Sequence, residues 1–245
     1  MRDKPYFIAE IAQAHDGSLG LLHSYIDAVA KTGVQAIKFQ MHIADAESSI
    51  HEPFRIKFSY EDDTRFDYWK RMEFTFEQWK GIKQHCDEVG LDFICSPFSN
   101  AAVDWLQQLD VKAYKVGSGE VNNFLLLDKI IQTGKPIIIS SGMSSFDELD
   151  LVVNYLKGKA ASFSILQCTT AYPTLPHQYG LNLITQLKER YNVSVGFSDH
   201  SAKTATGIAA VALGAEIIEF HVVFDRTMFG PDAIASLTIN ETKQL

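Results

Sequence analysis

Runs of apolar residues alternate with helical patterns along almost the whole chain. Eight of these runs predict strands: Tyr6–Ile11, Ala36–Gln40, Leu91–Ser96, Ala113–Val116, Pro136–Ser140, Phe163–Cys168, Val193–Phe197 and Glu216–His221. The segments between them predict helices near Leu21–Lys31, Phe76–Val89, Asn100–Leu109, Asn123–Thr133, Phe146–Leu156, Leu181–Arg190 and Lys203–Leu213. Because the strand runs are continuously apolar, they are typical of parallel strands buried on both faces.

Repeated strand–helix units predict an α/β fold, a (β/α)8 TIM barrel that occupies residues 1–245 as one domain. A doubly wound open sheet is the alternative, and it usually carries a GxGxxG turn after its first strand. The first strand here is followed by AQAHDGS, which lacks that motif. The pattern therefore favours the barrel.

Residues 41–74 interrupt the repeat between the second strand and its helix. Long loops inside compact domains are usually functional or disordered. The aromatic content of this segment argues against disorder, so we expect an ordered excursion over the barrel mouth. Arg65, Tyr68 and Arg71 are its candidates for selecting a substrate, and a solvated charged cap is the alternative.

Composition limits the partners and the compartment. The chain has 22 Lys+Arg against 30 Asp+Glu, a net charge of −8, which argues against binding to nucleic acid. No apolar run approaches the roughly 20 residues that span a bilayer, and Glu10 interrupts the N-terminal apolar stretch of a would-be signal peptide. Cys86, Cys95 and Cys168 form no CxxC pair and are expected to be buried free thiols. We therefore expect a cytoplasmic protein with neither membrane nor nucleic-acid partners.

Active sites of TIM barrels lie at the C-terminal ends of the strands. The polar residues expected there are Glu10, Lys38, Gln40, Ser96, Lys115, Ser140, Ser141, residues 168–172, Ser198, His200, Glu219 and His221. Lys38 and Lys115 fall within apolar strands, where lysine is rare unless it is paired. They indicate a highly charged anionic ligand, with phosphate as the first candidate. The GSG turn that follows Lys115 contains Ser118 and can present backbone N–H groups to a phosphate, although glycines also serve plain turns.

His200 and His221 end the last two strands. Adjacent strands are about 4.8 Å apart, so two imidazoles at their ends can bind one divalent first-row metal. Either histidine alone would more simply be a hydrogen-bonded core residue. Residues expected to orient the imidazoles or to touch a substrate at the mouth are Asp199, Glu219, His15 and His42.

A series of motifs then occurs in a familiar order: FIAEIAQAHDGSL, AIKFQMHIAD, FICSPFS, YKVGSGEVNN, KPIIISSGMSS, LQCTTAYPT, VGFSDHS, ALGAEIIEFH and GPDAIASL. Over essentially its full length the chain resembles the N-acetylneuraminate (sialic acid) synthase family. The resemblance implies a metal-dependent transferase of sialic acid biosynthesis. Phosphoenolpyruvate (PEP) would condense with N-acetylmannosamine or a related 2-acetamido aldose, releasing phosphate and a nine-carbon 2-keto sugar acid.

The resemblance also implies roles for individual residues. Glu10 and His221 would be catalytic, and His200 and His221 would bind the metal, Mn²⁺ first, with Mg²⁺ or Co²⁺ as alternatives. PEP would be bound by Lys38, Ser96, Lys115, Ser118, Ser140 and Ser198. The aminosugar would be bound by Gln40, Tyr172 and Asp232. Two lysines suit the charge of PEP, and a metal polarises the aldehyde.

Five positions depart from the family pattern: Ala14, Thr170, Phe220, Phe229 and Ala233. Members also generally continue into a C-terminal antifreeze-like domain that reaches a partner subunit. We therefore expect a barrel with a truncated last helix and without that domain, and a homodimer where the domain is present. Apolar surface beside the first and eighth strands would then be exposed.

Two other functions remain as alternatives. The first is a catalytically impaired barrel that binds a phosphorylated sugar or a partner protein, suggested by Ala14, Phe220 and the missing tail. The second is a related PEP-dependent synthase that uses a phosphorylated aldose. That substrate needs a second anion pocket, and no surplus arginine is visible at the strand ends.

Overall fold

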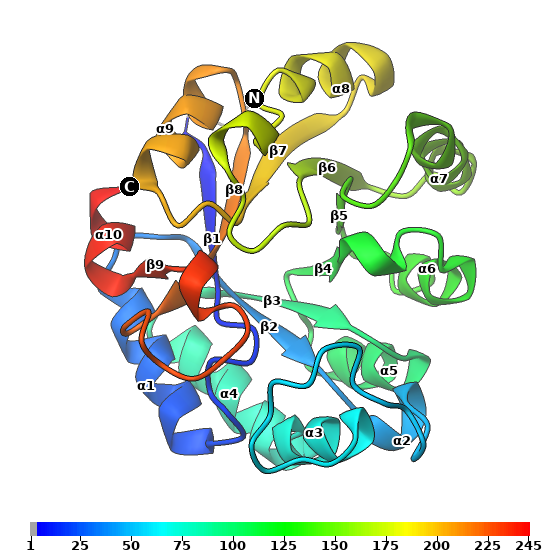
Figure 1. Cartoon of the computed structure of the whole chain (residues 1–245). Helices are drawn as coiled ribbons and strands as arrows, with labels where there is room; N and C mark the ends of the chain where they lie inside the picture. Colours follow the sequence, from blue (N-terminus) through cyan, green and yellow to red (C-terminus); the bar gives the residue numbers. More distant parts are fainter. Residues whose placement is uncertain (1–3) are drawn as a thin grey trace.

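The first and eighth strands pair in parallel and close a barrel (Figure 1). Its strands are β1 (Tyr6–Glu10), β2 (Ala36–Met41), β3 (Asp92–Pro97), β4 (Ala113–Val116), β5 (Ile137–Ser140), β6 (Phe163–Cys168), β7 (Ser194–Asp199) and β8 (Ile217–Val223). Each strand also pairs with the next one along the chain. This computed structural model describes residues 4–245, and it confirms the predicted TIM barrel.

The helices that follow the strands surround the barrel (Figure 1). They are α1 (Leu19–Ala30), α4 (Phe76–Glu88), α5 (Asn100–Gln108), α6 (Phe124–Ile131), α7 (Phe146–Gly158), α8 (Leu183–Tyr191) and α9 (Thr204–Ala212). Their positions match the predicted helices within two residues at each end. Capping boxes at Thr75 and Ser145 define the starts of α4 and α7, because each side chain bonds the third backbone N–H of its helix.

The excursion between β2 and α4 contains two short helices, α2 (Ala44–Glu47) and α3 (Arg65–Met72). A capping box formed by Thr64 and Asp67 begins α3. Near its end, the Arg71 guanidinium pairs with Asp16 at 2.6 Å and with Asp62 at 2.8 Å. The pair with Asp16 attaches the excursion to the first loop of the barrel, and the pair with Asp62 lies within the excursion, as expected for an ordered segment.

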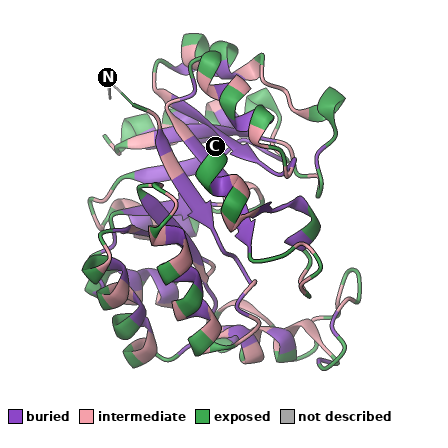
Figure 2. Cartoon of the chain, turned by 90° about the vertical axis from the view of Figure 1, so that its left-hand side faces the viewer, coloured by how far each residue is buried: buried purple, intermediate pink, exposed green. Residues whose placement is uncertain are grey.

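Side chains alternate between the inside and the outside of the barrel. Those facing inward near the N-terminal ends form an apolar floor: Tyr6, Ile8, Ala36, Ile94, Ala113, Ile138 and Leu166. Outward side chains pack with the helices in the main core, where strands and helices are buried against each other (Figure 2). Inward polar residues lie in the next layer, towards the C-terminal ends of the strands.

The last residues extend the sheet and then form a short helix. Strand β9 (Leu237–Thr238) pairs with Val222 and Val223 of β8, and α10 (Ile239–Gln244) packs against α9 and β8. Three short 3-10 helices complete the fold: η1 (Ser118–Glu120), η2 (Pro176–Gln178) and η3 (Ala233–Ala235). Within residues 4–245, no helix has both the length and the apolar character needed to cross a membrane.

The expectation of exposed apolar surface beside β1 and β8 is wrong for their outward side chains. Ala9, Ile218 and Phe220 are fully buried, because α1, α9, α10 and β9 surround this seam. Leu245 also contacts α9 close to Gly207. The short elements β9 and α10 thus cover this seam.

Candidate active site

Two lysines and two glutamates form a charged layer inside the barrel. Lys38 and Lys115 are only 4% and 3% exposed. Lys38 pairs with Glu10 and lies 3.9 Å from Glu219, measured from Nζ to Oε2. The Nζ atom of Lys115 lies 3.6 Å from the other carboxylate oxygen of Glu219. The lysines are therefore paired, which is the condition under which such residues can be buried.

Burial shifts the protonation of this layer. It raises the pKa of Glu10 and lowers the pKa of Lys115, because both charged forms lose solvation. Burial also opposes charge on Lys38, but Glu10 and Glu219 outweigh it and raise the pKa of Lys38. The same balance lowers the pKa of Glu219, where the two lysines outweigh burial. Glu10 is thus the carboxyl group of this layer that most readily keeps a proton.

Three predicted anion-binding serines adjoin these charges. Lys115 donates to Ser140 Oγ at 2.7 Å, and Lys38 lies 3.5 Å from Ser96 Oγ. Ser198 donates to Glu219 at 3.0 Å. The barrel therefore brings two ammonium groups and three hydroxyl groups to one buried region, which suits a multiply charged oxyanion.

Ser118 lies in η1 and reaches the end of β6, where its hydroxyl is 3.6 Å from Cys168 Sγ. Gly142 is part of the same contact. A Cβ atom there would be 2.5 Å from Ser118 Oγ and 2.6 Å from Thr170 Oγ1. Glycine at 142 therefore lets these hydroxyl groups approach the loop after β5. Cys86, Cys95 and Cys168 are buried and free, as predicted.

His200 and His221 face each other with ring centroids 5.3 Å apart. Tyr172 stacks on His200 at 4.2 Å. The Nδ1 atom of His200 is 3.0 Å from the backbone oxygen of Thr169. Since that oxygen only accepts hydrogen bonds, Nδ1 carries the proton and Nε2 is the ring nitrogen left for a ligand. Burial opposes charge on His200, but Cys168 and the Thr169 oxygen outweigh it and raise the pKa of this imidazole. Burial lowers the pKa of His221 well below its usual value, which keeps this imidazole neutral.

Neutral imidazoles with free lone pairs are suitable metal ligands. Asp232 Oδ2 is 3.8 Å from His221 Nδ1 and can orient that ring. Across residues 4–245, no group of three or more His, Cys, Asp or Glu side chains is arranged to hold a metal. Any ion bound here would thus have His200 and His221 as its imidazole ligands and would take its other ligands from water or substrate.

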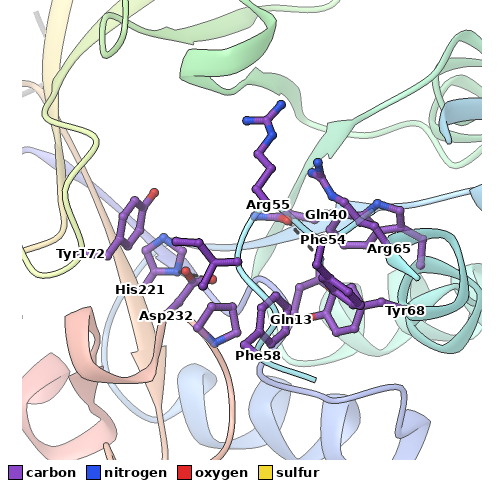
Figure 3. A pocket seen from close by; sticks show the side chains of 13 residues that line it. Gln13, Gln40, Phe54, Arg55, Phe58, Arg65, Tyr68, Tyr172, His221 and Asp232 are labelled. Carbon is purple, nitrogen blue, oxygen red and sulfur yellow. Dashed lines mark hydrogen bonds and ion pairs between the residues drawn. The ribbon is translucent and has the colours of Figure 1, made fainter. Parts of the chain in front are cut away.

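A cavity of about 420 Å³ opens beside His221 (Figure 3). Gln40, Tyr172 and Asp232, the three predicted sugar-binding residues, all line it. Arg65 and Tyr68 of the excursion line the opposite side, as Figure 3 shows. The volume falls within the range typical of small-molecule sites.

Gln40 connects this cavity to the charged layer below. Its Nε2 atom donates to Glu10 at 3.1 Å, and its oxygen accepts from Gln13 at 3.0 Å. His42 is within 3.3 Å of the same oxygen. This chain of amides orients the Glu10 carboxyl group towards the cavity side of the layer.

Some predicted residues have other contacts. Arg71 does not line the cavity, because Asp16 and Asp62 bind its guanidinium. Asp199 faces away from the barrel interior and accepts from the Ser201 N–H at 2.8 Å, so its hydrogen bond goes to a turn and not to an imidazole. Both expectations were wrong, because the partners of Arg71 and Asp199 lie in loops and turns whose conformation the sequence pattern does not predict.

The two histidines expected at the mouth are both buried. His15 accepts from the Gly17 N–H at 3.1 Å, and burial lowers its pKa to about 3. His42 is stacked between Trp69 and Phe98, at centroid distances of 3.8 and 4.4 Å. His15 therefore supports the first loop, whereas His42 lines a smaller cavity next to the first.

Sequence reasoning missed Arg55 and the main contacts of Glu219. Glu219 was expected at a strand end and as a residue that orients a histidine, yet it lies between both lysines. It precedes His221 by two positions on β8, so strand alternation could have predicted that both face inward. Arg55 lines the large cavity, but it lies in the excursion, where no periodic pattern indicates orientation.

Three departures from the family pattern differ in location. Phe220 is in the core between the barrel and the helices, not in the site. Ala14 also packs against that core. Thr170 lies beside Ser118 at Gly142, so of these three it is the one within the candidate site.

Residues 25–245 match the family model described as the NeuB family. The chain belongs to the NeuB family. Human N-acetylneuraminate-9-phosphate synthase is 34% identical to this NeuB-family chain over 98% of the chain and 68% of the human protein. N,N'-diacetyllegionaminic acid synthase of Campylobacter jejuni is 33% identical over 99% of the chain and 74% of that protein.

Solved structures resemble this NeuB-family barrel closely. An N-acetylneuraminic acid (sialic acid) synthetase from Leptospira borgpetersenii, crystallised with citrate, superimposes with a TM-score of 0.87 at 28% identity. The match covers 99% of this chain and 81% of the other. A spore coat polysaccharide biosynthesis protein from Bacillus subtilis gives 0.84 at 28% identity, covering 100% and 66%.

Proposed function

We propose that this NeuB-family chain condenses PEP with a 2-acetamido aldose, N-acetylmannosamine or a related sugar. The products would be phosphate and a nine-carbon 2-keto sugar acid. The observation that carries this proposal is the pair of buried lysines, Lys38 and Lys115, beside three serines and connected through Glu10 and Gln40 to the cavity that His221 lines. The names of the curated relatives, which include sialic and legionaminic acid synthases, support the same reaction class.

PEP would bind in the charged layer. Lys38 and Lys115 neutralise its charge, and hydroxyl groups of Ser96, Ser118, Ser140 and Ser198 donate to its oxygens. Without PEP, Glu10 and Glu219 balance the two lysines. A bound multiply charged anion competes with these carboxylates, so proton uptake by Glu10 would accompany binding.

The sugar would occupy the cavity above, with its aldehyde next to the histidines. Tyr172 offers an aromatic face, and Asp232 and Gln40 offer hydrogen-bonding groups to sugar hydroxyls. A divalent metal, Mn²⁺ first, held by His200 and His221 would supply a Lewis acid for the aldehyde oxygen. The Nδ1 hydrogen bond of His200 to Thr169 holds that ring in the tautomer needed for this role.

Carbon–carbon bond formation would proceed from PEP C3 to the aldehyde carbon. Positive charge then develops at PEP C2, water adds there, and C–O cleavage releases phosphate. Glu10 is opposite His221 in the β1–β8 register and has a raised pKa. It can give a proton to the oxygen formed from the aldehyde and then, as a carboxylate, stabilise the cationic carbon.

Phosphate release tests the proposal. Purified chain is incubated with PEP, Mn²⁺ and a panel of 2-acetamido aldoses, and inorganic phosphate is followed. Lys115→Met should abolish release, whereas Lys112→Met, which removes a more exposed lysine three residues earlier, should not. Absence of both phosphate release and saturable PEP binding would reject the proposal. PEP binding without release with any aldose would favour the non-catalytic barrel.

A further inference from the structure

His42 is a buried histidine, 3% exposed, whose two ring nitrogens both face hydrogen-bond acceptors. Its Nδ1 atom lies 2.6 Å from Glu47 Oε1, and its Nε2 atom lies 3.3 Å from Gln40 Oε1. A carboxylate oxygen and an amide oxygen only accept hydrogen bonds. Both ring nitrogens therefore donate, and the ring is a positively charged imidazolium paired with the Glu47 carboxylate.

The Glu47 carboxylate is itself held in place. Its Oε1 atom accepts from His42, and its Oε2 atom accepts from the backbone N–H of Ile43 at 3.4 Å. Glu47 is the last residue of α2, and the first residue of that helix, Ala44, donates its N–H to Glu73 at 2.9 Å. Because Glu73 directly follows α3, both short helices of the excursion support the ion pair.

Two aromatic rings fix the plane of the imidazolium. Trp69 of α3 stacks on it at a centroid distance of 3.8 Å and an interplanar angle of 10°. Phe98, which directly follows β3, stacks on it at 4.4 Å and 13°. At these distances the two rings must cover opposite faces, and aromatic faces attract a cation. The ring can therefore turn only if the excursion separates from the end of β3.

The imidazolium decides which way the Gln40 amide faces. The two ends of an amide have nearly the same shape, so hydrogen-bond partners determine which end lies where. The N–H donor of His42 requires the amide oxygen on its side, and Gln13 Nε2 donates to the same oxygen at 3.0 Å. The amide nitrogen of Gln40 must then face the other way, where it donates to Glu10 Oε1 at 3.1 Å.

This orientation matters because Glu10 is only 1% exposed and its other oxygen pairs with Lys38. Gln40 lines the large cavity and supplies the neutral contact of the Glu10 carboxyl group (Figure 3). A reversed amide would present an oxygen to that group, and only a protonated carboxyl group accommodates such a contact. The direction of one amide thus controls how Glu10 is held beside the cavity.

We propose that His42 is a positioning residue: as an imidazolium held by Glu47, it fixes the Gln40 amide so that Gln40 donates to Glu10. This inference rests on the proposed condensation, in which Glu10 is catalytic. It also makes turnover depend on the packing of the excursion, because Glu47 and Trp69 both belong to that segment.

Three substitutions of His42 separate its donors from its packing. His42→Phe keeps a ring for the stack and removes both donors. His42→Gln places an amide nitrogen near the position of Nε2, whereas His42→Asn places one near Nδ1, and both lose the stack. The kcat of phosphate release should fall about 10- to 100-fold in His42→Phe and His42→Asn, the range expected for a lost charged hydrogen bond. His42→Gln should retain most of the kcat, and KM for PEP should stay nearly constant in all three.

Two further measurements show whether His42 acts through Gln40. In a Gln40→Met background, adding His42→Phe should cause no further loss of kcat, because residues that act as one unit are not additive. Isotope labelling of the glutamine side chains gives an NMR readout that needs no turnover. The Gln40 amide signal, identified by its absence in Gln40→Met, should shift in His42→Phe. The control is the signal of Gln35, which accepts from the Phe7 N–H at 2.8 Å before β2 and should not shift.

Full kcat in His42→Phe, or equal kcat in His42→Gln and His42→Asn, would overturn the inference. Additive losses in the double variant or an unmoved Gln40 signal would do the same. Thermal melts establish that each variant is folded, and if His42→Phe is not, the comparison of His42→Gln with His42→Asn decides. If the unmodified chain releases no phosphate, the condensation is rejected, and the NMR signal alone decides whether His42 orients Gln40.

Discussion

Lys115 on β4 donates a hydrogen bond of 2.7 Å to Ser140 on the neighbouring strand β5. The hydroxyl group fixes the position of a buried ammonium group whose charged form burial disfavours. The remaining contacts of that ammonium group are the backbone oxygen of Val116 at 3.3 Å and Glu219. The proposed PEP site therefore includes a neutral side chain as well as charged ones.

Ser140→Ala should weaken PEP binding about tenfold or more, because a hydrogen bond to a charged group contributes about 1.5–3 kcal/mol. Calorimetric titration with PEP measures the change. Ser164→Ala is the control, since Ser164 is a buried serine nearer the floor of the same barrel. Unchanged affinity in Ser140→Ala would show that Lys115 needs no positioning by this hydroxyl group.

Glu219→Gln should lower thermal stability, since breaking a buried ion pair typically costs about 3–5 kcal/mol. The loss should shrink when PEP or inorganic phosphate replaces the missing negative charge beside Lys38 and Lys115. Differential scanning fluorimetry with and without ligand measures both effects. Glu216→Gln is the control, because it breaks a half-exposed ion pair with Lys188. It should cause a smaller loss of stability and a smaller recovery with ligand. A ligand-induced rise in Tm no larger than that of the unmodified chain would contradict this account.

Gly142→Ala should weaken PEP binding while the barrel stays folded. The new methyl group would displace the hydroxyl groups of Ser118 and Thr170, which can rotate away without disturbing the strands. PEP titration and circular dichroism distinguish the two effects. Gly119→Ala is the control, because no atom lies within 4 Å of its added methyl group. If Gly142→Ala binds PEP with normal affinity, Ser118 is not part of the PEP site.

A histidine pair on the outer surface predicts a pH effect on stability. The Nδ1 atoms of His23 and His85 lie 2.7 Å apart, and burial together with His85 lowers the pKa of His23. As pH falls from about 7.5 to 5.5, the unfolded chain takes up protons at its ordinary histidine pKa before folded His23 does, so stability decreases.

Thermal melts at the two pH values test this effect. His23→Gln should reduce the fall in Tm, whereas the control His51→Gln, at an exposed loop position, should not. An identical fall in Tm in the unmodified chain and in His23→Gln would show that protonation of this histidine pair does not contribute to the pH dependence of stability.

The barrel is readily predicted from sequence because its strands are short, apolar and regularly spaced, and all eight were located. Their ends also identified Lys38, Lys115, His200 and His221. The excursion was harder, since its conformation depends on distant partners such as Asp16 for Arg71. The role of Glu219 needed the closed ring, because its lysine partners lie on β2 and β4. No local pattern records such contacts across a barrel.

The pairing of Glu10 with His221 across the β1–β8 seam has a consequence for folding. These residues come from nearly opposite ends of the sequence and meet only when the barrel closes. A nascent chain therefore cannot form the candidate active site until β8 is synthesised. Closing contacts of such long sequence separation form late and slowly. Opening of this seam under mild denaturant would separate the two residues while most helices persist. With increasing denaturant, the rate of phosphate release should therefore fall before the helical circular dichroism signal does.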